Sequence, residues 1–400
     1  MPWGQNDTGV RGDTMKRGRL LLRKCLAMAL GTFLLAGSSI ASAKAERMQA
    51  NWVPDVYTIS SDRDGLLQSA GVKQKICQAL TDELKSLQAQ KKLPFEVKFS
   101  NDVQANAIQD DYSDTSSIGL VPIVLMDDAF TTHYHVGVED VYKALVTSSL
   151  GIAVCSTGAD ANESWRVLTI LPLNSYTIIG ADAKHMITSP ITRQQEADAY
   201  ADITVNMIKN HLDFSSTKKV LKNWEEKQMT PETYQVVDVG ISSKKAQQVF
   251  HGHDIEIRNI IGNFYTEAFQ KKNGCVMLPP GTSAAYAKDV TAGLYAMQLR
   301  SDNGERTFEM AKPKHEINLD FSGANWAEVQ RKDPSGVRKD VAYKAWLTET
   351  RNGQKRTEDA YDVQMYLEGA GKGNSVDVDA KDIYTKVLIG LADRMGKQGK

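Results

Sequence analysis

The stretch HEINLDFS, residues 315–322, alternates between apolar and polar side chains. Ile317, Leu319 and Phe321 occupy every second position, so they share one face of an extended strand. The polar residues between them share the other face. A strand with one apolar and one polar face is typical of an antiparallel sheet that is packed on one side. We therefore predict a half-buried strand at this point.

The same alternation, and a second pattern with helical spacing, extend over most of the chain. Further alternating stretches lie at residues 95–99, 341–347 and 361–367. Apolar residues three and four positions apart instead mark amphipathic helices. The predicted helices cover about residues 70–90, 197–212, 254–269 and 379–395.

The order of these elements runs through the chain twice. Ile59-Ser60-Ser61 matches Ile241-Ser242-Ser243, and Lys91-Lys92 matches Lys271-Lys272, in each case about 180 residues later. The predicted fold class is α+β, with two related domains that each hold an amphipathic helix, a mixed or antiparallel sheet and a closing helix. We interpret the recurrence as an internal duplication; chance similarity is the alternative, because few residues match.

A chain of 400 residues is long for one domain, and about two domains are expected. The predicted boundaries are 1–43 for an N-terminal extension and signal peptide and 44–214 for the first α+β domain. A linker helix at 215–232 would then precede the second α+β domain at 233–400. The linker is rich in lysine, which favours a solvated helix.

The order of elements within each half resembles two kinds of bacterial envelope domain. These are the periplasmic domain of the curli-secretion lipoprotein and the amino-terminal domain of the Tol-system β-propeller protein. The resemblance covers most of each half and implies a small α/β unit used in envelope assembly. The lipid-bearing cysteine of the curli-secretion family is missing, so the resemblance transfers no functional residue and no pore activity.

The first 43 residues have the three parts of a secretory signal peptide. Basic residues at 16–24 precede an apolar core at 26–35, and Ala41-Ser42-Ala43 places small residues where signal peptidase cuts. A membrane anchor is the alternative, but the core is shorter than the about 20 residues that span a bilayer. We expect cleavage after Ala43 and export to the periplasm or the exterior, with Met15 as the start of the signal.

Composition narrows the class of partner. The formal net charge is −1, which gives no electrostatic reason to expect nucleic acid. No second apolar run reaches spanning length, so no transmembrane segment is expected after the signal is removed. Cys77, Cys155 and Cys275 would remain, an odd number that excludes a disulfide scaffold and favours buried thiols.

Two His-x-His pairs are the candidates for metal chemistry. His133 and His135 are two positions apart in a predicted strand, so their rings share a face and could hold one zinc ion with a carboxylate. Asp127, Asp128 and Asp140 lie close by in the sequence. Solvent-facing histidines on a strand are the alternative. The second pair, at residues 251–253, precedes a helix and reads as a polar turn.

The sequence leaves three functions open. The leading one is an exported, non-enzymatic envelope or secreted protein that acts by binding a protein partner or by self-association, without a cofactor. A secreted metal-assisted hydrolase with zinc at His133 and His135 is the second. A periplasmic protein that binds a small ligand between the two halves is the third. No catalytic residue is assigned.

Overall fold

The computed structural model describes ten segments of the chain, and the statements below concern those segments. They are residues 48–59, 65–99, 117–136, 139–156, 165–180, 187–225, 232–281, 294–329, 338–367 and 376–398. Residues 48–400 form one compact unit. The predicted signal peptide and the predicted start at Met15 lie outside the described residues.

Nine strands form the first sheet, in the spatial order β3-β1-β4-β2-β10-β11-β7-β6-β5. Their bounds are β1 Gln49–Trp52, β2 Tyr57–Ile59, β3 Glu96–Phe99, β4 Ser117–Met126, β5 Ala129–Val136, β6 Glu139–Ser156, β7 Trp165–Ile179, β10 Leu294–Ser301 and β11 Gly304–Ala311. β1 lies parallel to both β3 and β4, whereas β6 lies antiparallel to β4, β5 and β7.

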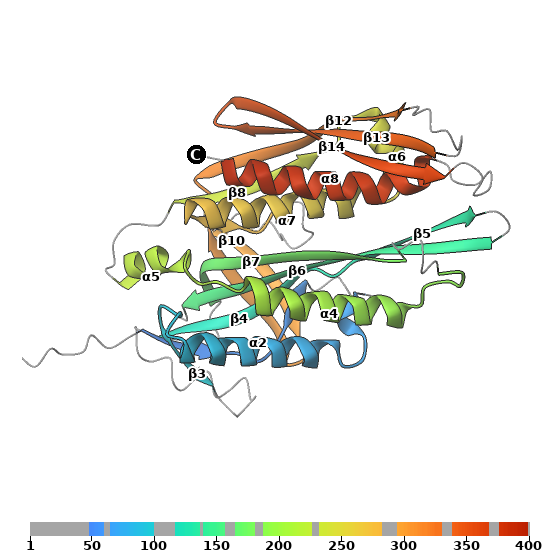
Figure 1. Cartoon of the computed structure of the whole chain (residues 1–400). Coiled ribbons are helices and arrows are strands. Elements are labelled where there is room, and N and C mark those ends of the chain that lie inside the picture. The colour runs from blue at the N-terminus through green and yellow to red at the C-terminus, as the bar shows by residue number, and fades with distance from the viewer. Residues whose placement is uncertain are drawn as a thin grey trace, which may run out of the picture. The chain divides into compact units, whose positions relative to one another are not determined.

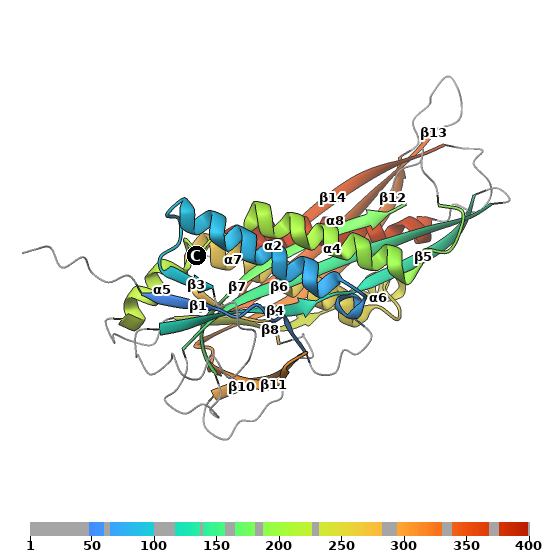
Figure 2. The same ribbon diagram turned by 90° about the horizontal axis from the view of Figure 1, so that it is seen from below.

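Six of these strands close on themselves. β4 pairs with β2 on one side and with β6 on the other, so β4-β2-β10-β11-β7-β6 forms a closed, mixed barrel. The hairpin of β10 and β11, drawn in orange in Figure 2, supplies the closing strands. The barrel interior is filled with buried apolar side chains, among them Tyr57, Trp165 and Phe308.

The second sheet has five strands in the order β14-β13-β12-β8-β9. Their bounds are β8 Thr233–Gly240, β9 Val276–Leu278, β12 His315–Val329, β13 Arg338–Arg351 and β14 Gln354–Leu367. β12 confirms the strand predicted from residues 315–322, since Ile317, Leu319 and Phe321 are all buried.

Helices separate and cover the two sheets (Figure 1). α2 (Val72–Ala89) and α4 (Arg193–His211) pack on one face of the first sheet, which is the face toward the viewer in Figure 2. α7 (Asp254–Asn273) and α8 (Val376–Gln398) lie between the two sheets and share one core with residues from both. The shorter elements are η2 (Leu66–Gln68), α5 (Thr217–Glu225) and α6 (Lys244–Val249).

The predicted fold class is wrong. The structure is 46% strand and 35% helix, so it is mostly β, with a closed barrel and a second sheet in place of two helix–sheet domains. The decisive strands are β10 and β11, because residues 294–311 come from the second half of the chain and pair with β2 and β7 of the first half. Alternation shows that a strand has a buried face but does not show which sheet that strand joins.

Five strands of the first sheet nevertheless have the same topology as the second sheet. β3-β1-β4-β6-β7 in the first sheet and β9-β8-β12-β13-β14 in the second have the same order, with two parallel contacts followed by two antiparallel ones. This shared order does not make the halves separate domains, because the barrel and the core around α7 and α8 both draw residues from each half.

Candidate functional site

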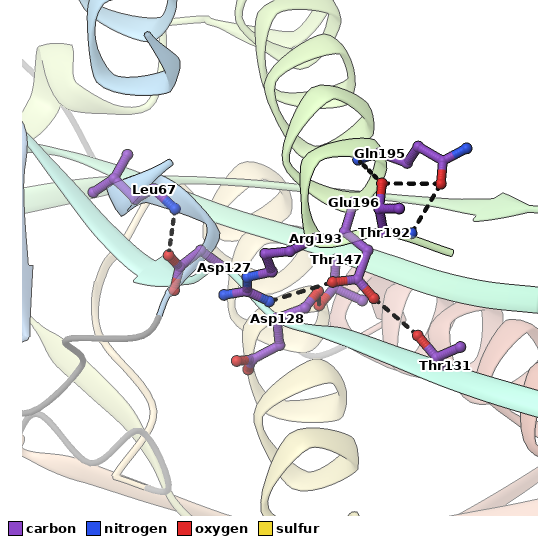
Figure 3. A network of polar contacts seen from close by, with 9 residues as sticks. All are labelled: Leu67, Asp127, Asp128, Thr131, Thr147, Thr192, Arg193, Gln195 and Glu196. Atoms are coloured by element: carbon purple, nitrogen blue, oxygen red, sulfur yellow. Dashed lines mark hydrogen bonds and ion pairs between the residues drawn. The ribbon is translucent and has the colours of Figure 1, made fainter. Parts of the chain in front are cut away.

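Carboxylates meet at the end of β4, under α4 (Figure 3). Asp127 is buried, and its Oδ2 accepts a hydrogen bond from the backbone nitrogen of Leu67 at 2.9 Å. Its backbone oxygen accepts a second bond, from the nitrogen of Leu66. A Cβ atom at Gly65 would overlap the Asp127 carboxylate, so a side chain there would displace it. Asp127 therefore anchors η2 to the end of β4.

The neighbouring carboxylate, Glu196, joins α4 to β5 (Figure 3). It lies in the first turn of α4 and is 8% exposed. One oxygen accepts a bond from the Thr131 hydroxyl at 2.8 Å, and the other lies 3.4 Å from a guanidinium nitrogen of Arg193. A capping box between Thr192 and Gln195 fixes the start of this helix. The cluster in Figure 3 is therefore a structural joint.

A buried hydroxyl chain continues this joint beneath α4. The hydroxyl oxygens of Ser148 and Thr204 are 2.8 Å apart, and the Thr204 hydroxyl donates a hydrogen bond to the backbone oxygen of Tyr200 at 2.6 Å. Burial raises the pKa of the Tyr200 hydroxyl well above its ordinary value, and the charge of Asp127 adds to the rise. The tyrosine therefore stays protonated at neutral pH.

Replacing Asp127 by alanine is expected to lower the free energy of unfolding by about 1–3 kcal/mol, because the Leu67 amide then loses its buried acceptor. Urea denaturation of a chain of residues 44–400 measures this change. Asp127→Asn is the matched control, since it keeps an oxygen acceptor and should lose less stability. Equal losses in the two variants would show that the acceptor is unimportant.

The predicted metal residues lie on β5. The Nε2 of His133 is 2.9 Å from an oxygen of Asp140, and the His133 ring stacks on Tyr142 with centroids 4.8 Å apart. His135 pairs with Asp140 through the backbone register, and its side chain lies outside the described part. Among the described residues, no group of three or more His, Cys, Asp or Glu is arranged to hold a metal. Zinc at His133 and His135 stays a prediction.

The other candidate residues have structural positions. His253, from the second His-x-His pair, packs against Phe130 with ring centroids 5.2 Å apart and precedes the first residue of α7. Cys77, Cys155 and Cys275 form no disulfide with one another. Cys155 is buried in the barrel, and burial raises the pKa of the Cys77 thiol to about 12. Thiolate chemistry is therefore disfavoured at Cys77 and Cys155.

A further candidate, which the sequence did not single out, is the side of the second sheet that no helix of the described segments covers. β13 and β14 form a long hairpin whose residues alternate between the α7/α8 side and the other side, which we call the open face. On β14 the exposed series is Lys355, Thr357, Asp359, Tyr361 and Val363. Tyr361 is 70% exposed and Val363 is 47% exposed.

Tyr361 and Val363 stand out among the described residues. The exposed large hydrophobic side chains there are Ile255, Tyr361 and Val363. Two of these three lie two positions apart on one strand, so they share a face. Exposed apolar side chains that gather on one face mark an interaction surface more often than single ones do.

The interior of the open face is ordered by specific contacts. Trp346 lies against Gly323, where a Cβ atom would come within 2.7 Å of the indole ring. The Lys344 ammonium is 5.0 Å from the centroid of that indole and 2.5 Å from an oxygen of Asp359. Hydroxyls of Thr348 and Thr357 are 2.8 Å apart across the strands. The surface that carries Tyr361 is therefore held in one arrangement.

β14 is also an edge. The four edge strands of the two sheets are β3, β5, β9 and β14, and β14 is the longest. β9 has only three residues. The edge of β3 is capped by the Gln88 amide, which accepts from the Val97 nitrogen at 2.5 Å and donates to the Val97 oxygen at 3.3 Å. In the described part of the chain, β14 pairs with β13 alone.

Within the described segments, no helix combines the length and apolar character needed to cross a membrane.

Comparisons with known proteins give little likeness. No protein-family model matches the chain, and no curated protein matches it. One similar solved structure is that of a neuraminyllactose-binding hemagglutinin homolog from Helicobacter pylori. It shares 12% identity, covers 46% of this chain and 92% of its own, and has a TM-score of 0.28.

Proposed function

We propose that this chain is an exported, non-enzymatic protein of the cell envelope or the exterior. It acts by binding a protein partner through the β14 edge and the side chains that β14 presents on the open face. The observation that carries this proposal is the placement of Tyr361 and Val363, exposed and side by side on the longest edge strand of the described chain.

Strand addition is the mode of binding that this surface favours. An edge strand presents unpaired backbone donors and acceptors that an incoming strand can satisfy. Tyrosine is enriched in binding hot spots, since it supplies apolar area and a hydroxyl at low entropic cost. Tyr361 on β14 therefore combines with the edge backbone to offer both affinity and specificity.

Two further observations support the proposal. The basic segment, apolar core and Ala41-Ser42-Ala43 site argue for export by their order and spacing. The carboxylates of Asp127 and Glu196, which would be the natural candidates for acid–base chemistry, hold η2, β5 and α4 together. N-terminal sequencing of the exported protein should begin at Lys44; retention of residues 1–43 would contradict the export step.

If the partner binds at the β14 edge, charge added to that edge should reduce the amount of partner that the chain captures. In pull-downs from envelope fractions, the double variant Tyr361→Lys/Val363→Lys should retain about a tenth or less of the protein that the unchanged chain captures. Quantitative mass spectrometry measures this ratio, because two added lysines would have to be desolvated in the complex.

Asn318→Lys is the matched control, since Asn318 is exposed on β12 of the same sheet and lies away from the β14 edge. It adds charge of the same kind and should leave capture unchanged. Thermal unfolding of both variants checks that the fold is intact. Equal capture by the double variant and the unchanged chain would contradict binding at β14.

A further inference from the structure

We infer that the partner of the β14 edge is β14 of a second copy of this chain. The two strands pair antiparallel about a two-fold axis at Tyr361, and the two five-stranded sheets become one continuous sheet. The inference rests on the proposed function and specifies its partner.

The β13–β14 turn determines which backbone groups of β14 are available. Asn352 and Gly353 have φ values of 51° and 76°, which is the conformation of a two-residue type I′ hairpin. Arg351 and Gln354 are then a hydrogen-bonded pair, and such pairs recur at every second residue. The N–H and C=O groups of residues 355, 357, 359 and 361 therefore point to the open edge, as does the Val363 C=O. The Val363 N–H donates to the Asp362 carboxylate at 2.8 Å, and an incoming strand would have to displace that contact.

The side chains of those same residues lie on the open face. An incoming antiparallel strand would thus bond to the backbone of Tyr361 and bring its own side chains beside the exposed tyrosine ring. In a two-fold pair centred on Tyr361, each Tyr361 lies opposite its symmetry mate and each Val363 lies opposite Asp359. The exposed apolar area of Tyr361 and Val363 is then shared between the two copies.

Repulsion between like charges disfavours four other alignments, or registers, of the two β14 strands. A pair centred on Glu358, Asp359 or Asp362 places identical carboxylates opposite each other, and a pair centred on Ala360 places Glu358 opposite Asp362. Like charges in directly opposed positions are destabilising. These four registers are therefore disfavoured.

The remaining registers differ in length. A pair centred on Thr357 can include only residues 354–360, and one centred on Val363 only residues 359–367, because β14 ends at Leu367. A pair centred on Tyr361 includes residues 355–367 and places no like charges opposite each other. It is the longest register without charge repulsion, so it gains the most backbone bonds.

Single cysteines test this register directly. Opposed residues of a hydrogen-bonded antiparallel pair have Cα atoms about 5.5 Å apart, within the range that a disulfide spans. Tyr361→Cys should therefore give a disulfide-linked dimer under mild oxidation, read on a non-reducing gel. Lys355→Cys, on the same strand and face, should not link to itself, because its two copies would lie about 40 Å apart.

The native thiols should contribute little background cross-linking. Cys155 is buried, and Cys77, with its pKa raised to about 12, is poorly reactive. Every variant also carries Cys275→Ser, since that thiol is partly exposed. A mixture of Lys355→Cys and Leu367→Cys chains should form the mixed dimer, which is a positive control for the register.

Sedimentation velocity of the exported chain, residues 44–400, gives an independent measure. Tyr361→Lys places two like charges opposite each other at the two-fold axis and should raise the dimer dissociation constant about tenfold or more, whereas Asn318→Lys should leave it unchanged. A monomeric unchanged chain, or cross-linking of Thr357→Cys in place of Tyr361→Cys, would overturn the inference. If the chain is monomeric but captures another protein through β14, the proposed function stands and only self-pairing fails.

Discussion

Phe308→Ala is expected to lower the free energy of unfolding by about 3–5 kcal/mol, the range for removing a buried phenylalanine. Phe308 lies on β11, is fully buried, and makes edge contacts with Tyr57 and Trp165 at centroid distances of 5.4 Å each. Those two residues come from β2 and β7, so the substitution weakens the closure of the barrel. Denaturant unfolding of a chain of residues 44–400 measures the loss.

Hydrogen exchange locates this effect. Amides of β2 and β7 should lose protection in Phe308→Ala, because both strands are held to the β10–β11 hairpin. Thr307→Ala is the matched control, since Thr307 is on the same strand but only half-buried, and should change stability by no more than about 0.5 kcal/mol. A loss in Phe308→Ala as small as in the control would contradict closure of the barrel by residues 304–311.

Two glycines on α8 should respond to alanine with opposite signs. A Cβ atom at Gly396 would lie 2.8 Å from the Tyr265 backbone oxygen and 2.9 Å from the Phe269 nitrogen of α7. Because backbone atoms cannot rotate away, Gly396→Ala should destabilise the protein by about 1–3 kcal/mol. Gly390 is exposed on the same helix and has no atom within 4 Å of such a Cβ. Gly390→Ala should therefore stabilise by about 0.5–1 kcal/mol.

Thermal and denaturant unfolding of the two variants measure this difference. Both substitutions raise helix propensity by the same amount, so the contrast isolates the close approach of α7 and α8. A gain in stability at both positions would show that the helices are further apart than the Gly396 contacts require. A loss at both would point to an effect on α8 itself.

Much of the local structure could be predicted from side-chain spacing. The apolar residues Val72, Ile76, Leu80, Leu84 and Leu87 recur at helical spacing, and all five are buried in α2. The alternation through residues 315–322 corresponds to β12. Such patterns are visible in the sequence because each depends on neighbours within one helix or strand.

The surroundings of α7 could not be predicted in this way. Its apolar residues suggested a helix with a solvated polar side, yet that side is covered by β7. The Asn174 side chain donates to the Asn263 backbone oxygen at 3.0 Å and to Glu267 at 2.8 Å, and Gln270 donates to the Ile170 oxygen at 2.9 Å. Polar residues on a helix therefore face another part of the protein here, a partner that lies about 90–100 positions earlier in the chain.

The candidate site could not be predicted from residue spacing either. Tyr361 and Val363 were visible as members of an alternating strand, but alternation normally places such residues inside. β14 instead turns them outward, because Glu358 and Arg356 lie on the side toward α8, where Arg394 and the Met395 oxygen contact them. The prediction of His133 and His135 relied on spacing alone, and spacing on β5 brings Asp140 to His133 without specifying a third ligand.

Residue spacing and local backbone geometry are enough to predict helices such as α2 and strands such as β12, together with the apolar side that each of them buries. Spacing does not predict that β10 and β11 close a barrel with β2 and β7, that two sheets enclose α7 and α8, or that β14 is an edge strand among the described residues; these depend on the folded arrangement. This difference arises because apolar burial is non-directional. It specifies that a face must be covered, and the choice of covering element depends on the packing of the whole chain.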